Sequence, residues 1–234
     1  MKKCIGILGG MGPEATLLMF KKIIGNTAAE KDQDHLEVII HNNTRVPDRT
    51  QGILYGGESP LPEIVRSALL LQNTGADLIV MPCMTAHYFY DDVSGQIDIP
   101  FLNAINETVD HIKTLDQAID NIGLLATTGT IKSRLFQTAL SQQGINTILP
   151  PVDQQEALVM EAIYGKQGIK AQGKSTYTNS RLRQAGHNLI QNGAQAILTG
   201  CTEIAIAVGQ ADFKCPVIDP MDVLAHSAIK HAFQ

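Results

Sequence analysis

Residues 75–87 read GADLIVMPCMTAH, and residues 193–205 read GAQAILTGCTEIA. The first stretch predicts a buried strand over residues 77–81 that delivers Cys83 to a turn, and the second predicts an equivalent strand before Cys201. Each cysteine follows its glycine, Gly75 or Gly193, by the same eight residues. Open α/β sheets place their chemistry at the carboxyl ends of parallel strands, so the two thiols are the first candidates for a functional site.

Outside these stretches, short apolar runs alternate with longer segments of helical spacing, a pattern that favours parallel sheets. Further strands are expected at residues 5–8, 38–40, 101–102, 122–126, 145–149 and 217–218, and helices at residues 13–27, 63–74, 105–115, 131–143, 154–164, 177–192 and 223–233.

Matched segments recur after nearly constant intervals, which indicates an internal duplication. The intervals are 117 residues from Gly6 to Gly123, 118 from Cys83 to Cys201 and 116 from Pro100 to Pro216. We therefore expect an α/β protein of two similar Rossmann-like lobes with parallel sheets and an active site in the cleft between them. The expected lobes are residues 1–115, completed by residues 217–234, and residues 116–216, with a boundary near residues 115–121.

Composition excludes several classes of function. The 234 residues are 44% apolar and 18% charged, a composition typical of a soluble globular protein with a hydrophobic core. A net charge of −5 without a long basic run makes nucleic acid and membrane unexpected partners. No apolar stretch suits a signal peptide or a membrane span, so we expect a cytoplasmic protein whose four cysteines are free thiols. The histidines and cysteines form no metal-binding pattern, so no metal is expected.

A lone cysteine on an apolar strand is usually a small buried hydrophobe, and this is our interpretation of Cys4 and Cys215. Cys83 and Cys201 differ because both stand where a strand stops, and the duplication would make them face each other. Two opposed thiols suit proton exchange at a carbon: one thiolate removes a proton from one face, and the other thiol delivers a proton to the opposite face. The product has inverted configuration.

Such chemistry places two demands on the protein. A free thiol has a pKa of about 8.5, so its acidity has to be tuned by its surroundings. Polar neighbours follow both cysteines, namely Thr85, His87, Thr202 and Glu203. No pyridoxal phosphate site is legible, so no cofactor is expected, and backbone amides and hydroxyls would have to stabilise the carbanion.

Three other segments are candidates for anion binding. Residues 127–130 combine three threonines with a predicted strand-to-helix turn, which suits an anion cradle or a plain helix cap. The loop at residues 42–49 carries Arg45 and Arg49, and an arginine can hold a carboxylate bidentately. Lys166 and Lys170 lie in a glycine-rich loop that either closes over an anion or stays solvated.

Residues 10–15 formally match the dinucleotide-binding pattern G-x-G-x-x-A. We discount it, because Glu14 would face the pyrophosphate. In addition, the second strand ends in Asn42 and Asn43 instead of the acidic ribose ligand.

Taken together, these motifs resemble the aspartate/glutamate racemase family, whose members need no cofactor, over nearly the full length. The resemblance is carried by residues 6–12 (GILGGMG), 42–50, 81–87, 126–130 (ATTGT), 200–204 (GCTEI) and 217–223 (VIDPMDV). Glu203 makes the chain most like the aspartate racemase branch, since the glutamate branch typically has histidine there. The resemblance implies two α/β lobes that each contribute a cysteine, and many members are dimers.

The resemblance also implies residue roles. Cys83 and Cys201 would be the acid/base pair, Arg49 would hold the substrate's side-chain carboxylate, and Lys170 would be the second cationic contact, with Lys166 as an alternative. The remaining expected substrate contacts are Met11, Thr85, Thr128, Thr130 and Thr202, and the expected supporting residues are Arg45, His87, Lys166 and Glu203.

One position departs from the family's Pro-Cys-Asn-Thr-Ala-His motif, because Met84 stands where the asparagine belongs. Methionine cannot donate the hydrogen bond that the asparagine would offer a substrate.

The expected function is cofactor-independent racemisation of aspartate, a small dicarboxylic amino acid, by a homodimer. Three alternatives stay open: a racemase of glutamate or of broader specificity, a single-thiol isomerase or decarboxylase, and a non-catalytic two-lobed carboxylate-binding module.

Overall fold

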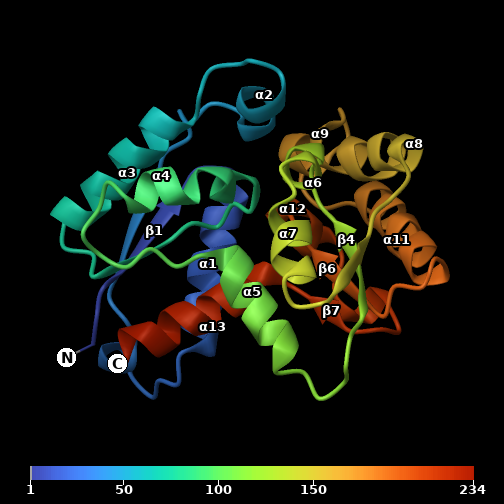
Figure 1. Ribbon diagram of the computed structural model, residues 1–234. Helices are drawn as coiled ribbons and strands as arrows, with labels where there is room; N and C mark the ends of the chain where they lie inside the picture. The colour runs from blue at the N-terminus through green and yellow to red at the C-terminus, as the bar shows by residue number, and fades with distance from the viewer. Residues whose placement is uncertain (1) are drawn as a thin grey trace. The chain divides into compact units, whose positions relative to one another are not determined.

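The computed structural model describes residues 2–234, which form two compact units. Unit 1 contains the residues up to Glu107 together with Met221–Gln234, and unit 2 is Thr108–Pro220. The chain leaves unit 1 within helix α5 (Ala104–Lys113) and returns at the start of helix α13 (Pro220–Ala232). Strands and helices alternate along both units (Figure 1).

Unit 1 is built on a parallel sheet in the order β2-β1-β3. Its strands are β1 (Ile5–Gly9), β2 (Val38–Asn42) and β3 (Leu78–Val80). Its helical elements, besides α13 and the start of α5, are α1 (Pro13–Asn26), η1 (Asp32–Asp34), α2 (Arg49–Leu54), α3 (Leu61–Asn73), η2 (Thr85–Phe89) and α4 (Tyr90–Ser94). A core that includes Leu8, Ile64 and Ile79 extends to Cys83.

Unit 2 is built on a parallel sheet in the order β5-β4-β6-β7. Its strands are β4 (Asn121–Leu125), β5 (Asn146–Ile148), β6 (Ala196–Thr199) and β7 (Val217–Ile218). Its helical elements are α6 (Thr128–Lys132), α7 (Leu135–Ser141), α8 (Val152–Gln154), the π-helix η3 (Gln155–Met160), α9 (Glu161–Tyr164), α10 (Ile169–Gln172), α11 (Thr176–Gln191), α12 (Thr202–Ala207) and η4 (Gln210–Asp212).

The two sheets share one register, as an internal duplication requires. Gly6 of β1 lies opposite Ile79 of β3, and Gly123 of β4 lies opposite Ile197 of β6. Ile79 also forms an isolated parallel bridge with Phe101, and Ile197 pairs in the same way with Val217 of β7. The α/β architecture of parallel sheets is therefore confirmed.

The glycines at these paired positions allow close packing. A Cβ atom on Gly6 would lie 2.9 Å from the Cβ of Ala76, and one on Gly123 would lie 3.0 Å from the Cβ of Ala194. Both alanines directly follow a glycine with positive φ, 103° at Gly75 and 97° at Gly193. The same left-handed turn thus brings a helix end against the central strand in both units.

Four expectations about elements need correction. Residues 217–234 are expected to complete the first lobe; residues 221–234 belong to unit 1, but β7 pairs with β6 of unit 2. This apolar pair fills the sheet position that Phe101 occupies in unit 1. The boundary between units falls at residues 107–108, inside α5, instead of near residues 115–121. Phe101 forms a single bridge and no strand. The helix expected at residues 131–143 is interrupted at Arg134, whose φ is 58°.

Within residues 2–234, none of the helices combines the length and the apolar character that crossing a membrane requires.

Candidate active site

Cys83 stands in a tight turn three residues after β3 ends. Its N–H donates to the Met81 carbonyl at 2.8 Å, and its own carbonyl accepts from the Ala86 N–H at 3.2 Å. The side chain is buried and belongs to the core of unit 1 together with Met11. The short strand therefore delivers the thiol to a fixed place, as the sequence predicts.

His87 fixes this turn to the start of α5. Its Nδ1 donates to the Cys83 carbonyl at 2.9 Å, and its Nε2 accepts from the Ala104 N–H at 3.1 Å. Burial lowers the pKa of His87 to about 4, although the carbonyls of Cys83 and Leu102 oppose this shift. The imidazole is therefore neutral near pH 7 and holds backbone groups on both sides.

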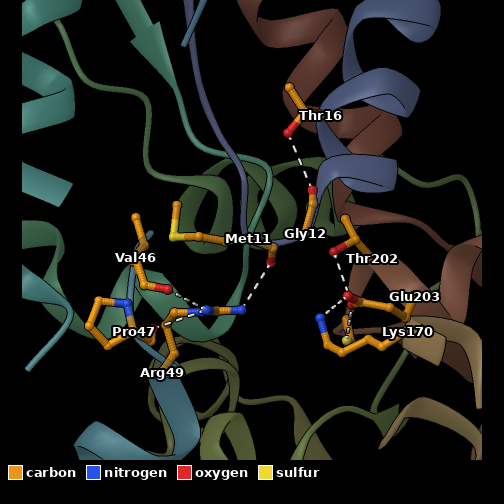
Figure 2. Close-up of polar contacts among 10 residues, drawn as sticks. Met11, Gly12, Thr16, Val46, Pro47, Arg49, Lys170, Thr202 and Glu203 are labelled. Atoms are coloured by element: carbon orange, nitrogen blue, oxygen red, sulfur yellow. Dashed lines mark hydrogen bonds and ion pairs between the residues drawn. The ribbon is translucent and has the colours of Figure 1, made fainter. Parts of the chain in front are cut away.

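Arg49 is a buried guanidinium at the start of α2 (Figure 2). Its Nη1 donates to the carbonyls of Val46 at 3.4 Å and Pro47 at 3.0 Å, and its Nη2 donates to the Met11 carbonyl at 3.4 Å. Arg45 is exposed in the same loop. The structure thus distinguishes the two arginines: Arg49 is held in place, and Arg45 faces solvent.

The Met11 turn is itself anchored on α1. The Thr16 hydroxyl donates to the Gly12 carbonyl at 3.3 Å (Figure 2) and accepts from the Gly10 N–H at 2.9 Å. Met11 is buried against the same core as Cys83.

Cys201 follows β6 and precedes α12 in unit 2. Its buried Sγ donates to Oε2 of Glu203 at 2.9 Å. Oε1 of the same carboxylate forms an ion pair with Nζ of Lys170 (Figure 2). The Thr202 hydroxyl also donates to Oε2 at 3.4 Å. One carboxylate thus connects the thiol to an ammonium group.

Burial raises the pKa of Cys201 well above its ordinary value, and the charge of Glu203 and its hydrogen bond raise the pKa further, while Lys170 lowers it. For Glu203, burial raises the pKa, but the Lys170 charge and the hydrogen bonds from Cys201 and Lys170 outweigh burial, so its pKa is lowered. The sulfur is therefore protonated beside an ionised carboxylate.

The two candidate lysines differ in their surroundings. Lys170 lies on α10, reaches Glu203 and stands over the Tyr164 ring at 5.5 Å from its centroid. Lys166 is exposed, and its carbonyl accepts from the Gln172 amide at 3.1 Å. Lys170 is the one that contacts a residue next to the second cysteine.

The three threonines of residues 127–130 are all buried, and they divide between a helix cap and a contact with Glu156. The Thr127 hydroxyl caps α6 by accepting from the Thr130 N–H at 3.2 Å, and the two hydroxyls lie 3.1 Å apart. Thr130 is completely buried. The capping interpretation thus describes Thr127 and Thr130, whereas the Thr128 hydroxyl donates to Glu156 at 3.1 Å.

Sequence reasoning missed the contribution of the π-helix η3. Glu156 of this segment meets the Thr128 hydroxyl, and the buried Gln155 amide donates to the Ala126 carbonyl at 2.9 Å. Met160 Sδ accepts from the Thr128 N–H at 3.3 Å. A π-helix has no clear sequence signature, although such segments are frequent at functional sites.

The remaining candidates, Thr85 and Thr202, are buried next to Cys83 and Cys201 in the chain, and Met84 is buried as well. All four cysteines are free thiols. Among residues 2–234 there is no group of three or more histidine, cysteine, aspartate or glutamate residues that could hold a metal ion.

A sequence model of the family described as Asp/Glu/Hydantoin racemase matches residues 8–228. The chain belongs to this family of racemases. The match confirms the resemblance that the motifs indicate and covers both cysteine-bearing strands.

Individual relatives agree with this assignment. The chain is 28% identical over 229 residues to the "Broad specificity amino-acid racemase RacX" of Bacillus subtilis, covering 96% of each protein. It is similar to the solved aspartate racemase of Picrophilus torridus, with a TM-score of 0.83, 31% identity, and coverage of 99% of this chain and 94% of that one. A glutamate racemase of Francisella tularensis, at 18% identity and a TM-score of 0.69 over 99% of this chain and 81% of that one, shares the fold.

Proposed function

We propose that the protein interconverts L- and D-aspartate without pyridoxal phosphate, by a two-base mechanism with Cys83 and Cys201 as the acid/base pair. The observation that carries the proposal is the equivalence of the two thiols: both are free, buried and placed after corresponding strands of the duplicated sheets. A purely structural cysteine does not need this duplication.

In the proposed reaction, the thiolate of one cysteine removes the α-proton, and the thiol of the other donates a proton to the opposite face of the carbanion. Each sulfur has to approach the α-carbon to about 3–3.5 Å. The electron pair left by the proton spreads onto the α-carboxylate, so hydroxyl and N–H donors aimed at its oxygens lower the barrier. After one turnover the two sulfurs have exchanged protonation states.

The proposed substrate contacts divide by charge. Arg49 and Lys170 bind the side-chain carboxylate, which two cations favour over an apolar side chain. The setting of Arg49 supports its part in this assignment, since the guanidinium is buried and held by the Met11 carbonyl. Lys170 is assigned from the family resemblance, and its ammonium pairs with Glu203. The α-carboxylate is assigned to the threonines Thr85, Thr128, Thr130 and Thr202, all of which are buried.

A broader amino-acid specificity is the second candidate, and Met84 is the observation that favours it. Its buried thioether replaces the asparagine of the family motif and offers a substrate no donor. The relative from Bacillus subtilis is a broad-specificity racemase. A site that depends less on hydrogen bonds discriminates less sharply between side chains.

Chiral chromatography tests the activity and the specificity together. The purified protein, without added pyridoxal phosphate, is incubated with each L-amino acid, and the D-form is quantified. The proposal expects D-aspartate as the fastest product and a higher preference for aspartate in Met84→Asn. Racemisation of many amino acids at similar rates would favour the second candidate, and no product from any of them would contradict both.

The same preparation tests the proposed homodimer. Sedimentation of the purified protein is expected to give twice the mass of the 25.3 kDa chain. A sedimenting species of one chain mass would contradict this assembly.

A further inference from the structure

Three side chains of unit 2 form a continuous polar chain that runs from the buried Cys201 through Glu203 to the partly exposed Lys170. Cys201 donates to one oxygen of Glu203, and Lys170 pairs with the other oxygen (Figure 2). We propose that Glu203, anchored by Lys170, holds Cys201 in its protonated thiol form, so that the resting protein offers Cys201 as the proton donor. The role of Cys201 as proton donor rests on the proposed function. The protonated state of the Cys201 thiol does not depend on that function.

The geometry places the proton on sulfur. An ionised carboxylate only accepts hydrogen bonds, and a thiolate has no proton to donate. A contact of 2.9 Å between Sγ and Oε2 therefore requires a proton on one of the two atoms. The ammonium of Lys170 keeps Glu203 ionised, and the Thr202 hydroxyl adds a second donor to Oε2. The shared proton thus belongs to Cys201.

The electrostatic surroundings within unit 2 agree with this state. Burial and the Glu203 charge raise the pKa of Cys201, and the Lys170 charge from α10 opposes them. Helix α11 also packs against α12. Its charged and titratable side chains are engaged elsewhere: Tyr177 bonds Glu161, Arg181 bonds the Ala157 carbonyl, Arg183 pairs with Asp212, and His187 contacts the Phe213 ring.

The duplication is broken at this position. Two residues after Cys83 stands the neutral Thr85, and two residues after Cys201 stands the acidic Glu203. A two-base reaction starts with one thiolate and one thiol, so the chain needs a device that decides which is which. Glu203 provides that device, and the resting protein should first process the enantiomer whose α-proton faces Cys83.

Thiol titration tests the inference without requiring racemase activity. Alkylation of each cysteine by iodoacetamide is followed by peptide mass spectrometry over a pH series in the full-length protein and in Glu203→Gln. Removing the charge should raise the thiolate fraction of Cys201 about tenfold at about pH 8, because a charge at this range shifts a pKa by about one unit or more. Alkylation of Cys83 should not change.

Glu161→Gln is the matched control, because it removes a carboxylate of the same unit that accepts a hydrogen bond from the Tyr177 hydroxyl at 3.1 Å. Among the described residues, the hydrogen bond of Cys201 Sγ goes to Glu203 and not to Glu161. Its Cys201 profile should match that of the unmodified protein. Because alkylation also depends on access, thiolate ultraviolet absorbance is titrated in a background where Cys4, Cys83 and Cys215 are serine. An unchanged Cys201 titration in folded Glu203→Gln would overturn the inference.

If the titrations shift as expected but no amino acid is racemised, the proposed function fails alone. If racemisation is found and the titrations do not shift, the inference fails alone.

Discussion

The Nδ1 atom of His87 donates a hydrogen bond of 2.9 Å to the carbonyl oxygen of Cys83. The other ring nitrogen accepts from the N–H of Ala104, so one imidazole joins the cysteine turn to helix α5. This arrangement fixes a single neutral tautomer, because Nδ1 must carry the proton. His87 is therefore a positioning residue whose protonation would break the contact with Ala104.

The depressed pKa of His87 predicts acid sensitivity. Burial holds the folded-state pKa at about 4 against an ordinary 6.5, so the unfolded chain binds the proton first as the pH falls. The resulting stability is complete above pH 6.5 and is lost towards pH 4. The difference corresponds to roughly 3 kcal/mol. Urea unfolding over a pH series should show this loss in the original protein, and a His87→Gln variant with the same pH slope would contradict the assignment.

His87→Ala should destabilise the protein by about 2–4 kcal/mol, because it removes both buried hydrogen bonds of the imidazole, to the Cys83 carbonyl and from the Ala104 N–H. The matched control is His226→Ala, since His226 is exposed and its Nδ1 also contacts a backbone carbonyl, that of Asp222, at 2.8 Å. Thermal and urea unfolding of both variants measures the difference. Equal small losses would show that the His87 bridge contributes little.

The shared packing of the duplicated sheets predicts paired effects. Gly6→Ala and Gly123→Ala should each cost about 1–3 kcal/mol, because the new Cβ meets other Cβ atoms at 2.9–3.0 Å. Gly25→Ala in α1 is the control, since nothing lies within 4 Å of its added Cβ, and it should stabilise the protein by about 0.5–1 kcal/mol. If Gly6→Ala and Gly25→Ala change the free energy of unfolding by the same amount, the close packing of Gly6 against Ala76 does not contribute to stability.

Arg49 and Arg45 should respond differently to substitution. Arg49→Lys keeps the charge but loses the planar fork that bonds the Met11 and Pro47 carbonyls, so the KM for aspartate should rise about tenfold or more. Arg45→Lys changes an exposed side chain and should leave the KM within about twofold. Steady-state kinetics with D- and L-aspartate measures both. A larger effect at Arg45 would move the proposed carboxylate contact to the exposed arginine.

The α/β fold was predictable because its signals are local and repeated. Gly75 and Gly193 end helices before apolar strands, and each strand leads to a cysteine, so the pattern alone locates both thiols. The family motifs then single out Arg49 and Lys170 among the cations, and the structure shows both in specific contacts.

Other features depend on contacts that sequence spacing does not encode. The partner of Lys170 is Glu203, which lies 33 residues further along the chain. Glu156 meets Thr128 through a π-helix, whose period differs from that of the expected helix. Strand β7 is only two residues long, so its partner strand could not be read from its composition.

Exchange of the α-proton of aspartate in deuterated water, followed by NMR with chiral analysis, tests the two-base mechanism most directly. The unmodified protein should give α-deuterated product of inverted configuration from either enantiomer. Cys83→Ser and Cys201→Ser should each stop racemisation. Each variant should exchange the α-proton of one enantiomer only, and the two variants should differ in which enantiomer that is. Cys4→Ser should behave like the original protein. Racemisation that survives the loss of either thiol, or the absence of exchange with every amino acid tested, would contradict the account.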